Sequence, residues 1–315
     1  MTSGDPTTTR TSIVLDCDPG LDDAVAIALA LRHCDVAGIT TVGGNVGIEM
    51  TTANALAVTD LLGRSEVEVH AGHDRPFGGL ATERAADVHG PNGMGDTELP
   101  APTRPATSSD AVRFLLDRSR ATDGLWLVAT GPLTNIAHAV TADPTLVDRV
   151  AGVSWMGGST TYGNATAAAE FNAWADPEAA DVVLGAGFRR VLMHGLGVTH
   201  SVLLDEAWID GLASTGGTVA TTYADILRYY LHSQTAVSVL DGAAVHDALA
   251  VLHVSHPDLF AGVDRAVTVV RHGEARGMTL VDTRPMREPP APNVEVVERA
   301  DADAIRALIA EALAI

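Results

Sequence analysis

Residues 12–33 read SIVLDCDPGLDDAVAIALALRH and contain two patterns in succession. The first, over residues 12–17, is a short apolar run with the length and composition of a buried strand. The second, over residues 22–33, places apolar side chains at helical spacing, namely Val25, Ile27, Ala28 and Leu31. A buried strand that leads into a helix is the repeating unit of a parallel α/β sheet. The stretch therefore predicts the first strand and the first helix of such a sheet.

The same alternation continues along the chain. Further strands are expected over residues 35–41, 67–70, 125–129, 150–156 and 190–194. Further helices are expected over residues 49–62, 109–119, 133–140 and 177–184. Apolar strands separated by helices are typical of sheets that are buried on both faces. We predict an α/β fold with an open, mostly parallel, Rossmann-like sheet and helices on both faces.

The last third of the sequence has a different pattern. Helices are expected over residues 208–212, 220–239, 245–254 and 302–314, a hairpin over residues 266–271 and 278–282, and a strand over residues 293–297. We predict that this region is an α-rich C-terminal cap over the active site, within one domain of residues 12–315. Residues 1–11 are polar, Thr-rich and without the apolar core of a signal peptide, which predicts a disordered tail.

Composition excludes several classes of function. The formal charge is −20 and no basic stripe relieves it, so nucleic acid is not expected as a partner. All the basic side chains besides histidine are arginines, which excludes Schiff-base lysine chemistry and Walker-type phosphate loops. No window is apolar enough to span a bilayer, so no membrane partner is expected. Cys17 and Cys34 stand in neither a disulfide nor a zinc spacing, which favours a cytoplasmic location.

Four carboxylates follow the first strand, at Asp16, Asp18, Asp22 and Asp23. Ligands of open parallel sheets bind at the carboxyl ends of the strands. Helix capping explains one aspartate well but not four. The helix dipole contributes only about 0.3–1 kcal/mol per carboxylate, too little to offset their crowding beside a buried strand. A bound cation would offset it, and all-oxygen ligands suit calcium or magnesium.

Two classes of enzyme open with such a strand. Residues 16–18 resemble the Asp-x-Asp of dehalogenase-like phosphatases, but those enzymes usually need a lysine, which this chain lacks. Residues 16–24, DCDPGLDDA, match in full the opening motif Asp-x-Asp-Pro-Gly-x-Asp-Asp-Ala of the inosine–uridine nucleoside hydrolase family. The chain resembles this family in later segments too: Gly44-Asn45, His89-Gly90, residues 130–135 (TGPLTN), residues 156–158 (MGG), Gly163-Asn164, residues 169–172 (AEFN) and residues 245–248 (VHDA). The segments stand in the family's order and cover roughly residues 12 to 300.

The resemblance implies a Ca²⁺ site at the floor of a ribose pocket. By the family pattern, Asp18, Asp23 and Asp247 bind the metal through carboxylates and Thr130 binds it through its backbone carbonyl. Asp16 is expected to support the loop instead. The alternatives to metal binding are purely structural. Residues 130–132 could form only a strand-to-helix turn, and Asp247 could be an ordinary aspartate of a first helical turn.

The resemblance also implies how a ribonucleoside is bound. The expected substrate-binding residues are Asp22, which accepts from a ribose hydroxyl, Asn45, His89, Met156, Asn164, Glu170, Phe171, Asn172, Tyr230, Gln234 and His246. An extended strand would point Glu170 and Asn172 the same way. Asn164, in a Gly-Asn pair, could instead be a turn residue.

The implied reaction is hydrolysis of the N-glycosidic bond to ribose and free base. Asp18 takes a proton from the attacking water beside the metal. Asn45 is expected to be a catalytic residue as well. Carboxylate and amide oxygens around the ribose stabilise an oxocarbenium-like transition state. His246 protonates the departing base, since imidazole titrates near neutrality. Relatives are usually homodimers or homotetramers, and the same is expected here. The alternatives are a dehalogenase-like phosphatase and a non-catalytic nucleoside-binding protein.

Base selection is predicted from spacing. Tyr230, Gln234 and Ser238 stand at intervals of four residues, so a helix places them on one face. Beside that face runs a row expected to be buried, formed by Leu227, Leu231, Thr235 and Val239. Tyr230 would stack on the base and Gln234 would bind its edge, which suits uracil and hypoxanthine.

Several residues are expected to lie outside the chemistry. Histidines without a motif are predicted at the surface, at His33, His138, His253 and His272, and three aromatic residues are predicted only to pack, at Trp155, Tyr162 and Phe188. After residues 190–194 the family usually has Leu-Asp-Val-Thr, whereas this chain has Gly197 at the second position. We expect that departure to alter loop support rather than activity.

Overall fold

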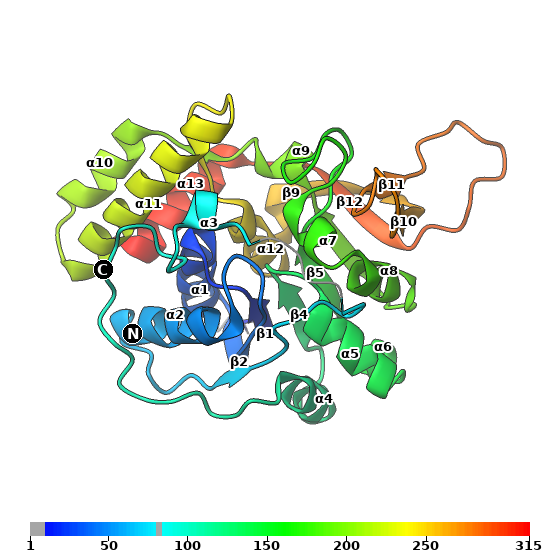
Figure 1. The fold of residues 1–315 in the computed structure, drawn as a ribbon, viewed down its shortest axis with the longest axis horizontal. Helices are drawn as coiled ribbons and strands as arrows, with labels where there is room; N and C mark the ends of the chain where they lie inside the picture. Colours follow the sequence, from blue (N-terminus) through cyan, green and yellow to red (C-terminus); the bar gives the residue numbers. More distant parts are fainter. Residues whose placement is uncertain (1–9, 80–83) are drawn as a thin grey trace, which may run out of the picture.

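The computed structural model describes residues 10–79 and 84–315. Most of the predicted tail, residues 1–9 of 1–11, therefore lies outside the described residues. The centre is an eight-stranded sheet in the order β3-β2-β1-β4-β5-β6-β12-β9 (Figure 1). Its strands are β1 (Ser12–Cys17), β2 (Asp35–Thr41), β3 (Val69–Ala71), β4 (Trp126–Ala129), β5 (Gly152–Met156), β6 (Val191–His194), β9 (Phe260–Arg265) and β12 (Val294–Ala300). All neighbours pair in parallel except β9 and β12, so the predicted mostly parallel sheet is confirmed.

Each face of the sheet is covered by helices. Side chains alternate along β1: Leu15 belongs to one apolar cluster and Val14 to another. The first cluster includes side chains of α1 (Leu21–His33), α2 (Ile48–Leu61), α11 (Thr218–Val237), α12 (His246–Ser255) and α13 (Ala302–Leu313). The second includes side chains of α4 (Ala111–Ala121), α5 (Thr134–Ala142) and α8 (Pro177–Gly185). Helices on both faces, as predicted, bury the strands from two sides.

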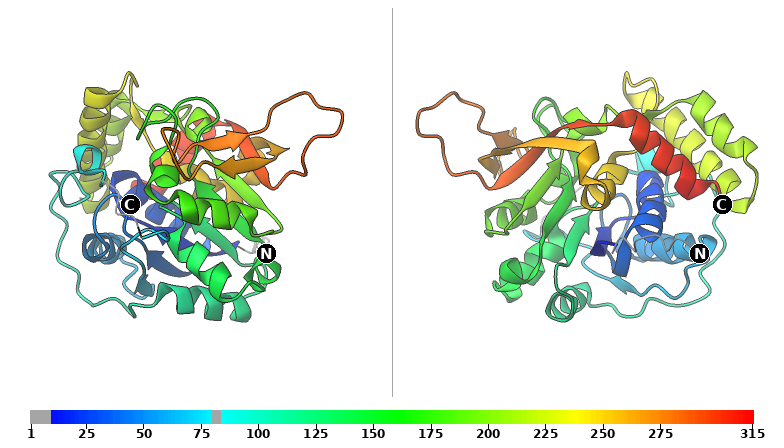
Figure 2. Two further views of the ribbon diagram at one scale, coloured as in Figure 1. Left: turned by 45° about the vertical axis from the view of Figure 1, so that its right-hand side comes forward. Right: turned by 180° about the vertical axis from the view of Figure 1, so that it is seen from behind.

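The C-terminal region builds both a helical cap and an edge of the sheet. Helix α10 (Glu206–Ser214) packs along α11, and the short helix α3 (Ala86–His89) lies against α11 as well (Figure 1). The predicted hairpin is present as the antiparallel strands β10 (Val267–Val269) and β11 (Thr279–Val281). The segment after β11, residues 282–292, projects from the body in both views of Figure 2.

Some elements were not predicted from the sequence. Strand β9 was missed because it lies at the sheet edge and its FAGVDR sequence is only partly buried, so no apolar run marks it. Other missed elements are short: α3, α6 (Leu146–Arg149), α7 (Phe171–Ala175), α9 (Leu196–Thr199), β7 (Leu203–Leu204), β8 (Ala243–Ala244) and the 3₁₀ turn Pro257–Leu259.

Helix α11 ends earlier than its apolar pattern suggested. It stops at Val237, where the prediction extended it to residue 239. Tyr230 and Gln234 are buried, as are Leu227 and Leu231. Val239, expected in the buried row, is 98% exposed because the chain has already left the helix there. The buried stripe is therefore correct only over the first part of the predicted row.

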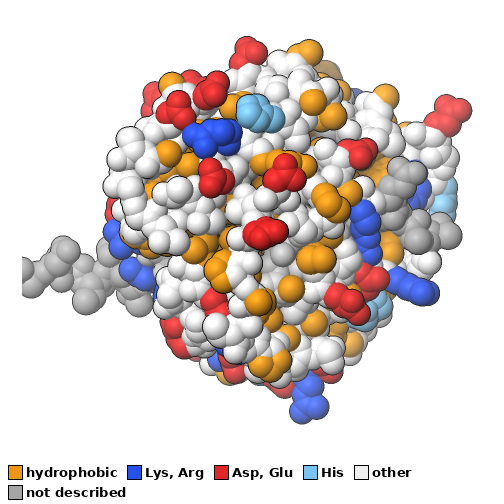
Figure 3. All heavy atoms as spheres, turned by 60° about the vertical axis from the view of Figure 1, so that its left-hand side comes forward, with side chains coloured by type: hydrophobic (Ala, Val, Ile, Leu, Met, Phe, Trp, Pro, Cys, Tyr) orange, Lys and Arg blue, Asp and Glu red, His pale blue; other side chains and the backbone are white. Residues whose placement is uncertain are grey.

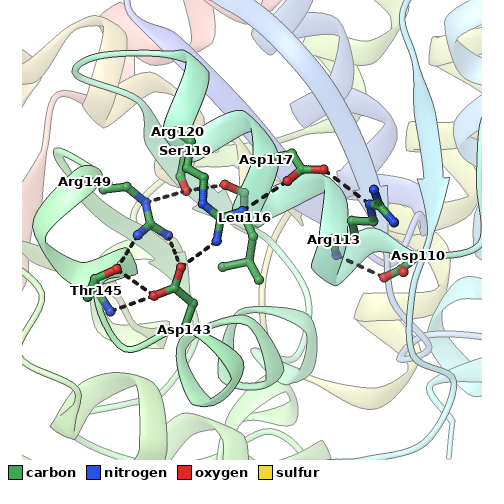
Figure 4. Close-up of polar contacts among 9 residues, drawn as sticks. All are labelled: Asp110, Arg113, Leu116, Asp117, Ser119, Arg120, Asp143, Thr145 and Arg149. Carbon is green, nitrogen blue, oxygen red and sulfur yellow. Dashed lines mark hydrogen bonds and ion pairs between the residues drawn. The ribbon is translucent and has the colours of Figure 1, made fainter.

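The surface reflects the strongly acidic composition. On the face in Figure 3, acidic and basic side chains are scattered among neutral and apolar ones, and the basic ones form no stripe. Many arginines are held in local ion pairs. Arg120 and Arg149, for example, both contact the Asp143 carboxylate, at 2.7 and 3.1 Å (Figure 4). Within the described residues, no helix combines the length and the hydropathy needed to cross a membrane.

Candidate active site

A cavity of about 340 Å³ opens at the carboxyl ends of the strands. Its walls come from segments that follow β1, β2, β4 and β5, and from α3, α11 and the first turn of α12. All the predicted substrate-binding residues line it: Asp22, Asn45, His89, Met156, Asn164, Glu170, Phe171, Asn172, Tyr230, Gln234 and His246. Of the predicted metal ligands, Thr130 and Asp247 line it too. The structure thus brings together residues that are far apart in the sequence.

Three carboxylates meet at the floor of the cavity. One oxygen from each of Asp22, Asp23 and Asp247 lies within 4.8 Å of the other two, and all three side chains are buried. Asp23 is held by the backbone N–H of Gly20 at 2.9 Å and by the Thr130 hydroxyl at 2.7 Å. The first turns of α1 and α12 supply this group, so both helix dipoles point positive ends toward it.

Asp18 lies beside this group with one oxygen free. Its Oδ2 accepts from the backbone N–H of Asn45 at 2.7 Å, whereas its buried Oδ1 has no partner among the described residues. Gly44 and Gly131 leave room for this carboxylate, because a Cβ on either would stand 2.0 or 2.5 Å from an Asp18 oxygen. The glycines of the family segments Gly44-Asn45 and 130–135 therefore make the space in which the Asp18 carboxylate packs.

The electrostatics of the floor favour a cation. Burial raises the pKa of Asp18 and Asp247 well above the ordinary value, and the neighbouring carboxylates add to the rise. Burial and Asp23 raise the pKa of Asp22 to about 8. Close carboxylates in a dry site cannot all ionise without positive charge. The free Asp18 Oδ1 and the all-oxygen donor set fit a hard divalent metal.

The structure gives several of the predicted site residues contacts within the protein as well. Asp22, expected to bind a ribose hydroxyl, is the third member of the close carboxylate group, and its Oδ2 accepts from Tyr230 Oη at 3.2 Å. The Thr130 carbonyl, expected to face a metal, accepts from Asn172 Nδ2 at 2.8 Å. Asp16 lies apart from the group and accepts from Thr40 and Asn135, in keeping with a supporting place.

The wall formed by residues 169–172 does not adopt the extended conformation that would point Glu170 and Asn172 the same way. Glu170 is the N-cap of α7, and its carboxylate accepts from the backbone N–H groups of Gly158, Asn172 and Ala173. Burial raises the pKa of Glu170 to about 7. Helix capping accounts for this conformation, because a buried carboxylate at a helix start satisfies several free N–H groups at once. Asn164 Oδ1 accepts from Phe171 N at 2.9 Å and so ties this wall together.

His246 lies between the floor and the far wall. Its Nδ1 is 2.7 Å from Thr199 Oγ1 and its Nε2 is 3.4 Å from Gln234 Nε2. Gln234 Oε1 accepts from Ala244 N at 2.7 Å, which fixes the amide so that its nitrogen faces His246. Burial, with His200 and His89 nearby, lowers the pKa of His246 to about 3. Burial therefore opposes, in the unliganded protein, the positive charge that the expected role of this imidazole as an acid requires.

Sequence reasoning missed part of the cavity. Tyr162, predicted only to pack, is 53% exposed and lines the cavity together with His200. His253, predicted at the surface, is buried with its Nδ1 2.9 Å from His194 Nε2. Tyr162 and His253 belong to no recognisable motif. The sequence signal for His200 was its place directly after Thr199. Trp155 and Phe188 are buried in the core, as predicted.

Comparison with known proteins agrees with this geometry. The family model described as inosine-uridine preferring nucleoside hydrolase matches residues 13–307. The pyrimidine-specific ribonucleoside hydrolase RihA of Enterobacter is 38% identical, with 86% of this chain and 87% of the relative covered.

Solved structures give the same result. A plant nucleoside hydrolase (PpNRh1) superposes with a TM-score of 0.91 at 30% identity, covering 97% of this chain and 99% of its own. A purine-preferring ribonucleoside hydrolase from Gardnerella vaginalis has a TM-score of 0.90 at 33% identity, covering 96% and 98%. Through its sequence, its fold and its carboxylate-floored cavity, this chain belongs to the inosine-uridine nucleoside hydrolase family of N-glycosyl hydrolases.

Proposed function

We propose that this chain is a calcium-dependent hydrolase of ribonucleosides of the inosine, uridine and cytidine type, releasing ribose and free base. The observation that carries the proposal is the buried group of Asp22, Asp23 and Asp247 at the cavity floor, with the free Asp18 Oδ1 beside it. Hydroxyl-rich ribose suits a floor of carboxylates and a cation, and a planar base suits the partly aromatic walls beyond.

In this proposal Ca²⁺ would be held by the carboxylates of Asp18, Asp23 and Asp247 and the carbonyl of Thr130, with Asp22 adjacent. A bound cation supplies positive charge that acidifies the attacking water and orients the ribose hydroxyls. Asp18 accepts the proton of that water through the oxygen that lacks a protein partner. Asn45 fixes the carboxylate of Asp18 through its backbone N–H.

The remaining residues surround the sugar and the base. Asp22, Asn164, Glu170 and Asn172 face the ribose, and their oxygens favour the positive charge that develops on it as the glycosidic bond breaks. His246 faces the departing base as its proton donor. Because its pKa is about 3 without substrate, we propose that it gains its proton only in the substrate complex.

The relatives leave the choice of base open, since one is named pyrimidine-specific and another purine-preferring. We propose that Tyr230 and Gln234 take part in that choice, from α11, as a broad or pyrimidine-leaning preference. Gln234 keeps one amide N–H free for a base carbonyl after its contacts with Ala244 and His246. We further propose a cytoplasmic homodimer or homotetramer of the single 12–315 domain, which light scattering after gel filtration would check.

One panel tests the proposal. The protein is incubated with inosine, uridine and a phosphate monoester, each with Ca²⁺ and with a chelator, and free ribose and phosphate are measured. We expect ribose release that depends on Ca²⁺ and no phosphate release. Phosphate release would support the phosphatase alternative, and nucleoside binding without ribose release would support a non-catalytic binding protein.

A further inference from the structure

Two side chains in the outer part of the cavity have no place in the reaction described above. Tyr162 Oη and His200 Nδ1 lie 2.9 Å apart, in hydrogen-bond contact, and both line the cavity. They come from separate segments: Tyr162 from the loop between β5 and α7, and His200 from the residue that follows α9. A hydrogen bond between such segments places an imidazole at a set position in the wall.

His200 lies beside His246 in the cavity wall. The two imidazole rings lie 5.3 Å apart between centroids and are tilted by 58°. The preceding residue, Thr199, holds His246 Nδ1 at 2.7 Å. Two neighbouring residues of the chain therefore adjoin His246, Thr199 through a hydrogen bond and His200 through its ring. Because His246 is proposed to donate its proton to the base, a ring 5.3 Å from it lies within reach of the same base.

The loop that carries Tyr162 is anchored before substrate binds. The hydroxyl of Thr279, in β11, donates to the Ser159 carbonyl at 2.8 Å and accepts from the Ser159 N–H at 2.9 Å. Gly163 N donates to the Ala167 carbonyl at 3.2 Å, which closes the loop on itself. Anchoring on both sides of Tyr162 limits the motion that its exposed ring would otherwise have.

We propose that His200 contacts the nucleobase and that Tyr162 holds the His200 ring in position for that contact. With Nδ1 engaged by the phenol, Nε2 is left for the base edge, and the flat ring offers a stacking surface. His200 is thus a specificity-determining residue and Tyr162 a positioning residue. The inference rests on the proposed function and adds a base contact that lies outside α11.

The test uses His200→Ala, Tyr162→Phe and the double variant in the calcium-loaded protein. Two quantities are measured: the KM for inosine and uridine, and the inhibition constant of free ribose, which has no base. The controls are His232→Ala and Tyr229→Phe, the same changes at residues that do not line the cavity. His200→Gln, which keeps most of the side-chain volume, is the second variant if His200→Ala fails to fold.

We expect His200→Ala to raise the nucleoside KM by roughly tenfold, the scale of one lost contact to a base, and to leave the ribose constant within about twofold. Tyr162→Phe should raise KM by a smaller factor, and the double variant should be no worse than His200→Ala, because the two residues act through one contact. An unchanged KM, an equal change in the ribose constant, or additive effects would each overturn the inference. Absence of ribose release by the wild type would instead overturn the proposed function.

Discussion

The floor and the outer rim of the cavity are built in opposite ways. At the floor, Asp22 and Asp23 are adjacent in the sequence, almost fully buried and held by the first turn of α1. At the rim, Tyr162 is 53% exposed and comes from a loop, and Ser238 lines the cavity from just beyond the end of α11. The floor concentrates charge in a dry site, whereas the rim offers flat and weakly polar surface to solvent and ligand.

That contrast separates two kinds of constraint. A buried carboxylate beside others is tolerated only if a cation or a hydrogen bond balances it, so floor substitutions change the chemistry itself. A half-exposed rim side chain costs little to replace and changes mainly which base fits. We expect variants of the floor to lower turnover severely and variants of the rim to shift selectivity.

The largest effect is expected for Asp18→Ala at the floor. The substitution removes the proposed base and a proposed metal ligand together, so kcat on inosine should fall at least ~10³-fold. The matched control is Asp87→Ala, which removes one carboxylate from an exposed site on α3. Near-wild-type turnover of Asp18→Ala would remove this residue from the mechanism.

His246→Ala, between floor and rim, should have the next largest effect. Inosine, whose base leaves poorly without a proton, should lose roughly 10²-fold in kcat. With p-nitrophenyl riboside, whose leaving group needs little help, the loss should be much smaller. Equal losses on both substrates would argue that His246 orients Asp247, its neighbour in the chain, instead of donating a proton.

Gln234→Ala tests the residue whose amide nitrogen contacts His246 from α11. If the free N–H of Gln234 binds a base carbonyl, kcat/KM should fall roughly tenfold for uridine and inosine and less for adenosine. Ser233→Ala is the neighbouring control, because Ser233 does not line the cavity. A common factor for all three nucleosides would show that Gln234 acts through its contacts with His246 and Ala244.

The smallest signal is expected in the pH dependence of stability. The folded pKa of Asp22 is raised from 3.8 to about 8, so metal-free protein should lose stability as pH rises through that window. Ca²⁺ bound next to the ionised Asp22 would offset the loss. The difference in Tm between calcium-loaded and chelated samples should therefore be larger at pH 8 than at pH 5. Taking the difference cancels contributions from distant histidines, and a difference that shrinks with pH would contradict the expectation.

Regular elements were predictable wherever burial imposes a period on the sequence. Strands β1, β2, β4, β5 and β6 and their covering helices appear close to the expected places, because a buried strand must be apolar along its length. Edge strand β9 and helix α7 were missed. The first is only partly buried, and the second begins at a capping carboxylate, Glu170, that also resembled a substrate ligand.

The residues of the cavity likewise differ in how far the sequence predicts them. Most of the floor was visible in residues 16–24, because Asp18, Asp22 and Asp23 come from one strand end and one helix start, and such local geometry is written in consecutive residues. Asp247 joins them from the first turn of α12 only after the chain folds. The pairing of Tyr162 with His200 and the fixed amide of Gln234 were not visible. Each depends on segments that meet only after the chain folds, where a single hydrogen bond leaves no periodic or local mark in the sequence. The protonation of His246 belongs to the same class, since burial by distant segments, and not the imidazole's own chemistry, sets its pKa.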